Sequence, residues 1–265
     1  MGWGTIDENA ALAGLERAYE LGISLFDTAD VYGHGRSERL LGRLVEQVSR
    51  DSIVLSSKVG YFTGTAPHGY HPRHMRHQLE QTLDNLRTDH VDIYFFHHAE
   101  FGSGDVYLEP AIEAMRHFRK EGLIRTVGMR GPHRFVLDRL ADGPRTDKVV
   151  RFHELFERIA PDVLAVRDNL LTPQDRSSGI FAFAGERGCG VLVNKPLGQG
   201  PLTGSYDPTA PRLCSEGDHR SRKRWFTAMS VRRPRISCGS RRGRACSASS
   251  RRWFWSASAI RLRLR

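Results

Sequence analysis

The chain has 265 residues, of which 39% are hydrophobic and 9% aromatic, enough for one large α/β domain or two small ones with a hydrophobic core. It has no apolar run near the roughly 18 residues that cross a bilayer, no signal peptide in residues 1–8 and no CxxC pair among its four cysteines, so we expect a cytoplasmic protein with reduced thiols and no membrane partner. Its net charge of +10 would favour an anionic partner, but the positive excess lies in the last segment of the chain.

Segments with helical and strand-like spacing alternate along the chain. Apolar periodicity predicts helices over 7–21, 37–48, 72–86, 108–121, 133–141, 147–159 and 180–187. Short apolar runs predict strands at 23–26, 53–55, 91–96, 124–129, 163–166 and 190–193. Asp7 is the expected N-cap of the first helix and Ser37 that of the second. This alternation predicts a parallel sheet with helical crossovers, two strands short of a closed eight-stranded barrel.

Residues 228–265 have a different composition. They contain eleven arginines, no lysine and no acid, so residues 1–227 carry a formal charge of −1. We therefore divide the chain into a barrel-like domain, 1–227, and an Arg/Ser-rich tail, 228–265, that is disordered or read out of frame. A nucleic-acid-binding tail with Trp253 and Trp255 as stacking groups is the less favoured interpretation, so no nucleic-acid partner is expected.

Four polar residues follow the predicted strands. Asp27 ends the first strand and Tyr32 lies five residues later, while Lys58 and His97 come at or after the ends of the second and third. In a barrel of parallel strands such side chains converge on one face. Each also has an ordinary explanation: Asp27 could order a loop, Tyr32 could pack in it, Lys58 could be solvated and His97 could be a hydrogen-bonded core histidine.

The motifs around these residues resemble those of the aldo-keto reductases. The resemblance is carried by Phe26-Asp27-Thr28-Ala29-Asp30-Val31-Tyr32-Gly33 with Ser37-Glu38, by Ser57-Lys58-Val59-Gly60, by Asp92 through His97, and by Gly190 through Gly204. It covers about residues 1–227. It implies a (β/α)8 TIM-type barrel, here incomplete because the first and last strands are not recognisable, that reduces an aldehyde or ketone with NADPH, or with NADH as the alternative. A catalytically inactive binding or regulatory relative is the second hypothesis.

The resemblance also implies a role for each of the four residues. Tyr32 would donate the proton and His97 would orient the carbonyl. Lys58 would tune Tyr32, and Asp27 would hold Lys58 charged. A neighbouring ammonium stabilises a phenolate, so we expect Lys58 to lower the pKa of Tyr32 from its usual value of about 10.

Further residues are expected around the cofactor and the substrate. By resemblance, the cofactor-binding residues are Asp27, Arg130, Asn169, Asn194, Lys195, Pro196, Leu197 and Gly200. Arg130 stands where the family often has a serine, and we expect it to recognise the carboxamide instead. The substrate is a small carbonyl compound, and its expected pocket residues are Tyr61, Phe62, His98 and Phe101. The histidines at 68, 71, 74 and 77 span a loop and a helix start, so no metal site is expected. The sequence leaves the oligomeric state open.

Overall fold

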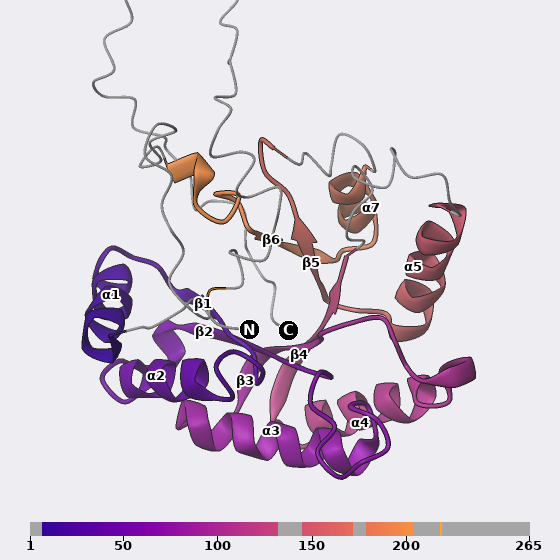
Figure 1. Ribbon diagram of the computed structural model, residues 1–265, viewed down its shortest axis with the longest axis horizontal. Helices are drawn as coiled ribbons and strands as arrows, with labels where there is room; N and C mark the ends of the chain where they lie inside the picture. Colours follow the sequence, from indigo (N-terminus) through magenta and orange to yellow (C-terminus); the bar gives the residue numbers. More distant parts are fainter. Residues whose placement is uncertain (1–6, 132–144, 172–178, 204–217, 219–265) are drawn as a thin grey trace, which may run out of the picture.

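The structure is a computed structural model that describes residues 7–131, 145–171, 179–203 and 218 (Figure 1). The helix expected at 133–141 and the tail at 228–265 lie outside the described residues. None of the described helices is both long and apolar enough to cross a bilayer.

A six-stranded parallel sheet forms the centre of the described fold. Its strands lie side by side in sequence order, which is the arrangement that helical crossovers between neighbouring strands produce. They are β1 (Leu25–Asp27), β2 (Val54–Val59), β3 (Val91–Phe96), β4 (Ile124–Arg130), β5 (Val163–Arg167) and β6 (Gly190–Asn194). The sheet curls into a partial barrel with the helices on its outer side (Figure 1). The α/β barrel type expected from the sequence is therefore confirmed.

The helices lie close to where the apolar spacing predicts them. They are α1 (Glu8–Glu20), α2 (Arg36–Val45), α3 (Pro72–Leu86), α4 (Leu108–Lys120), α5 (Arg145–Ile159) and α7 (Ile180–Glu186), with short 3-10 turns at Arg50–Ser52, Ser103–Asp105 and Pro201–Thr203. Asp7 caps α1 as predicted, because its Oδ1 accepts hydrogen bonds from the backbone N–H groups of Asn9 and Ala10.

Three predicted boundaries need correction. Ser37 is not the N-cap of α2: that residue is Gly35, with φ of +78°, and the Ser37 hydroxyl accepts a hydrogen bond from Thr28 Oγ1 at 2.8 Å. The helix also ends at Val45, three residues before the predicted end at Val48. Strand β2 continues to Val59, past the apolar run that predicts it. Its polar residues can be buried there because Ser56 donates a hydrogen bond to Asp27 and Ser57 donates one to Glu38.

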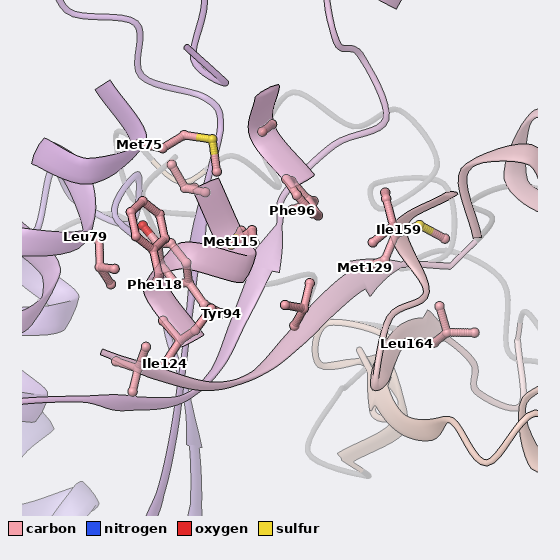
Figure 2. Close-up of a cluster of buried hydrophobic side chains, with 14 of the residues drawn as sticks. Met75, Leu79, Tyr94, Phe96, Met115, Phe118, Ile124, Met129, Ile159 and Leu164 are labelled. Atoms are coloured by element: carbon pink, nitrogen blue, oxygen red, sulfur yellow. The ribbon is translucent and has the colours of Figure 1, made fainter. Parts of the chain in front are cut away.

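The main hydrophobic core lies between the outer side of the sheet and the helices. Figure 2 shows side chains of α3 and α4 packed against those of β3 and β4, with Tyr94, Phe96, Met75 and Met115 almost fully buried. Residues that alternate with these along the strands face the inside of the barrel. A second cluster there consists of Ile93, Phe95, Val163 and Ala165, with Leu25, Val54 and Leu192 packed on it.

Candidate active site

A cavity of 410 Å³ opens at the carboxyl ends of the strands. Strand pairing explains how residues far apart in sequence reach it: Asp27 pairs with Ser56 on β2, Lys58 with Phe95 on β3, and Arg130 with Ala165 on β5. Because side chains alternate between the two faces of a strand, inward-facing residues at successive strand ends meet in one place. The described lining residues are Leu25, Asp27, Tyr32, Lys58, Tyr61, His97, Arg130, Ala165, Leu192, Val193, Asn194, Lys195 and Gln199.

Asp27 and Lys58 form an ion pair in the wall of this cavity. The Lys58 Nζ lies 2.7 Å from both carboxylate oxygens of Asp27 and also donates to the backbone carbonyl of Thr28. Ser56 donates to the same carboxylate. Burial lowers the pKa of Lys58, and the Asp27 carboxylate opposes that shift by favouring the charged amine.

Tyr32 lies beside this pair, in the loop between β1 and α2. The Lys58 Nζ is 5.2 Å from the centre of the Tyr32 ring, and the ring centroid of His97 is 6.0 Å from that of Tyr32. Burial, followed by the negative charge of Asp27, raises the pKa of Tyr32 to about 12. The pKa of Tyr32 is thus raised rather than lowered as expected, because burial and the Asp27 carboxylate both disfavour the phenolate.

His97, Tyr61 and Arg130 are lining residues of the cavity that contact one another. The rings of Tyr61 and His97 meet edge to face with centroids 4.4 Å apart. Arg130 donates from Nη1 to the Tyr61 hydroxyl at 3.2 Å and to the His97 carbonyl oxygen at 3.0 Å. All four residues expected to be catalytic, Asp27, Tyr32, Lys58 and His97, thus line one cavity.

The residues expected at the cofactor divide into two groups. Asp27, Arg130, Asn194 and Lys195 line the cavity. Asn169 does not line it, but its amide donates to the Lys195 carbonyl oxygen at 3.0 Å and so holds that wall in place. The remaining expected residues, Pro196, Leu197 and Gly200, lie in the turn after β6 and are not among the described lining residues.

The expected substrate residues are spread more widely. Tyr61 lines the cavity, whereas His98 is not among its described lining residues and has its Nε2 2.9 Å from the Gly60 carbonyl oxygen. Phe62 lines a different cavity. Phe101 is in the core rather than in a pocket wall: it is fully buried and stacks on Tyr70 at 4.6 Å, a contact that its loop sequence does not reveal.

Gln199 is a lining residue that the sequence interpretation did not select. Its backbone has φ of +67°, and its side chain is buried at the cavity. The flanking glycines of Gly198-Gln199-Gly200 indicate a tight turn, which is the only sequence signal that could have pointed to it.

A second cavity, of 520 Å³, lies beside the loop that carries Tyr32. Its described lining residues include Asp30, His34, Glu38 and Phe62. Asp30 is 4% exposed and its Oδ1 accepts the Val31 N–H at 2.6 Å. Burial, opposed in part by that hydrogen bond, raises the pKa of Asp30 to about 7. The loop between β1 and α2 thus contributes to both cavities, with Tyr32 in the first and Asp30 and His34 in the second.

The family model and the similar proteins that match this chain all point to the aldo/keto reductases. The model of the Aldo/keto reductase family matches residues 1–256, which extends beyond residue 227, where we expected the resemblance to end. L-galactose dehydrogenase of Arabidopsis thaliana is 28% identical over 223 residues, which are 80% of this chain and 64% of that protein. The chain therefore spans less than two thirds of that relative's length.

Solved structures show the same fold. Aldo-keto reductase AKR11C1 from Bacillus halodurans superposes with a TM-score of 0.59 and 25% identity, covering 82% of this chain and 65% of that one. An aldo-keto reductase from Klebsiella pneumoniae in complex with NADPH has a TM-score of 0.55 and 24% identity, covering 78% of this chain and 66% of that one.

Proposed function

Because this chain belongs to the aldo/keto reductase family, we propose that it reduces a small aldehyde or ketone with NADPH and that Tyr32 donates the proton. One observation carries the proposal: Asp27, Tyr32, Lys58 and His97, which come from three strand ends and one loop, line a single cavity of 410 Å³. Carbonyl reduction needs an acid close to the oxygen that becomes negatively charged, and this cavity supplies one.

The charges around Tyr32 suit the transfer of a proton to an alkoxide. With a pKa of about 12, Tyr32 carries its proton at neutral pH and can give it to an alkoxide, which is a much stronger base than a phenolate. The Lys58 ammonium, 5.2 Å from the ring centre, would stabilise the phenolate that remains. The His97 ring lies edge to face with that of Tyr32, with centroids 6.0 Å apart, and His97 would orient the carbonyl oxygen next to the Tyr32 hydroxyl.

The residues of the cavity fit the nicotinamide end of the cofactor. Leu25, Ala165 and Leu192 give an apolar surface on which a flat ring can lie, and Asn194 adds an amide that can hydrogen-bond a carboxamide. Lys195 would bind the cofactor near the same wall, because its backbone is held by the hydrogen bond from Asn169 to its carbonyl oxygen. When bound, the reduced nicotinamide supplies a hydride to the carbonyl carbon.

NADPH oxidation by the purified chain, followed spectrophotometrically with a panel of aldehydes and ketones, tests the proposal. We expect turnover that depends on the carbonyl compound and that falls by about 10² to 10⁴-fold in Tyr32→Phe, with the circular dichroism spectrum unchanged. The matched control is Tyr19→Phe, since Tyr19 lies on α1, its hydroxyl contacts Ser52, and it is not among the described lining residues of the cavity. Equal activity in Tyr32→Phe and Tyr19→Phe would contradict the proposal, and no turnover by the wild type would favour the inactive relative.

A further inference from the structure

We propose that Tyr70 and His98 are positioning residues for His97: together they hold the backbone that carries the His97 ring, so that this ring stays beside that of Tyr32. The inference rests on the carbonyl reduction proposed above, in which His97 orients the carbonyl oxygen. Tyr70 and His98 are not among the described lining residues of the cavity, so we assign them no direct contact with the substrate.

His97 is the first residue after β3, where the regular pairing of the sheet ends. Its backbone N–H donates to the Val59 carbonyl oxygen of β2 at 3.0 Å, and its buried side chain lines the cavity. The residues that follow form the loop that leads to the 3-10 turn Ser103–Asp105. Since the direction of a side chain follows from its backbone, the direction of the His97 ring depends on what holds the start of this loop.

The Tyr70 hydroxyl bonds both backbone groups of His98. It donates to the His98 carbonyl oxygen at 2.7 Å and accepts the His98 N–H at 2.9 Å, as a hydroxyl can because it is both a donor and an acceptor. The Tyr70 ring is fixed as well: it is fully buried, stacks on Phe101 with centroids 4.6 Å apart and meets Phe96 edge to face at 5.4 Å. Tyr70 thus contacts the residues on both sides of His97.

The His98 side chain joins the same loop to the end of β2. Its Nε2 lies 2.9 Å from the Gly60 carbonyl oxygen, and its Nδ1 accepts the Glu100 N–H at 3.2 Å. A nitrogen that accepts a hydrogen bond carries no proton, so Nε2 is the donor to Gly60 and the ring is neutral. Burial lowers the pKa of His98, which favours this neutral form. Because Gly60 is two residues after Lys58, the bond also fixes His97 relative to the strand that carries Lys58.

Loss of the Tyr70 hydroxyl would leave the backbone N–H and carbonyl of His98 without this partner. Unpaired polar groups away from water are unfavourable, so we expect the backbone to move toward other partners. Catalysis is sensitive to such movement, because a displacement of about 1 Å can lower the rate by about 10²-fold. A phenylalanine at this position would keep the ring contacts with Phe96 and Phe101, so Tyr70→Phe tests the hydroxyl and not the packing.

Two pairs of variants test the inference. The control for Tyr70→Phe is Tyr94→Phe, the same change at another fully buried tyrosine, whose hydroxyl is not bonded to His97 or His98. His98→Phe removes both bonds of the imidazole, whereas His98→Gln keeps an N–H that can donate to the Gly60 carbonyl oxygen. Circular dichroism and urea denaturation show that each variant is folded before it is compared.

Steady-state kinetics of carbonyl reduction give the first measurement. In Tyr70→Phe we expect kcat to fall by about 10-fold with the KM for NADPH unchanged, because the residues proposed for the cofactor keep their places. His98→Phe should show a similar loss, His98→Gln should lie between it and the wild type, and Tyr94→Phe should behave as the wild type. An equal kcat in Tyr70→Phe and Tyr94→Phe would overturn the inference.

A double-mutant cycle with His97 separates positioning from a general structural role. If Tyr70 acts through His97, adding Tyr70→Phe to His97→Ala should change kcat by less than about twofold, because the ring that Tyr70 positions is already absent. A loss as large as that in the wild-type background would show that Tyr70 acts independently of His97, and would refute the proposed role.

A measurement without turnover distinguishes failure of this inference from failure of the proposed function. In protein labelled at histidine with ¹⁵N, the variant His97→Gln assigns the ring resonances of His97. We expect these resonances to broaden or divide in Tyr70→Phe, because the ring then samples several orientations, and to stay unchanged in Tyr94→Phe. If no carbonyl compound is reduced, the proposed function fails and the spectra decide: broadening in Tyr70→Phe alone supports the positioning role, and unchanged resonances refute it.

Discussion

The ammonium of Lys58 lies 2.7 Å from each oxygen of the Asp27 carboxylate, but the two partners are buried to different extents. The Lys58 side chain is 7% exposed, whereas that of Asp27 is 41% exposed. The cost of leaving a charge unpaired is greater in the interior than near water. The two ends of this ion pair should therefore respond differently to substitution.

We predict that Asp27→Asn destabilises the protein more than Lys58→Met. Asp27→Asn leaves a buried ammonium without its counter-charge and should cost about 3 kcal/mol, the lower end for broken buried pairs because Asp27 is partly solvated. Lys58→Met removes the buried charge itself and leaves Asp27 with Ser56 and water. Urea denaturation at neutral pH measures both. A larger loss of stability in Lys58→Met would contradict this assignment of the buried charge.

The titration of Tyr32 gives a second prediction. Its pKa is raised to about 12 by burial and by Asp27, so NMR of isotope-labelled tyrosine should show Tyr32 still protonated at about pH 11, where exposed tyrosines have ionised. Since the folded pKa is the higher one, the contribution of Tyr32 to stability is lost as pH rises from about 10 to about 12. In Asp27→Asn the signal should move at lower pH, because the second cause of the shift is removed. Tyr32→Phe assigns the signal, and an unchanged titration in Asp27→Asn would show that burial alone is responsible.

Much of this site could be predicted from short-range patterns. Alternation along β1 and β2 places Asp27 and Lys58 on the same face, and the apolar runs mark where each strand ends. Other features depend on contacts between distant segments. Phe101 is in the core because Tyr70 lies against it, and the pKa of Tyr32 depends on burial that no local pattern encodes. The N-cap of α2 is Gly35, whose backbone is left-handed. Serine is a common N-cap residue, so the nearby Ser37 led to the wrong prediction.

Asp30 should make stability depend on pH in the acid range. Burial raises its pKa from 3.8 to about 7, so the ionised form is disfavoured in the folded state. The resulting cost is absent below about pH 4, grows as pH rises to about 7 and is constant above that, reaching on the order of 4 kcal/mol. Asp30→Asn carries no such cost. The stability of the wild type relative to Asp30→Asn should therefore fall between pH about 4 and about 8 when urea denaturation is repeated across that range.

The exposed residue Asp51 supplies the control for this experiment. Asp51→Asn removes a carboxylate from the same chain without removing a buried one, so its stability curve should follow that of the wild type. Curves for Asp30→Asn and the wild type that stay parallel from pH about 4 to about 8 would show that Asp30 ionises without a burial cost.

Two helical glycines give a last prediction, on how closely α2 approaches α3. A Cβ at Gly42 would lie 2.3 Å from the backbone oxygen of Asn85, so Gly42→Ala must push the helices apart, whereas a Cβ at Gly14 in α1 would meet nothing within 4 Å. We expect Gly42→Ala to cost about 1–3 kcal/mol by overpacking and Gly14→Ala to stabilise by about 0.5–1 kcal/mol through better helix propensity. The separation would also strain the hydrogen bonds that Thr82 and Asn85 donate to the Glu38 carboxylate, which join the same two helices beside the second cavity. Urea midpoints of the two variants measure the contrast, and a midpoint of Gly42→Ala at or above that of the wild type would show that α2 and α3 have room that the structure does not give them.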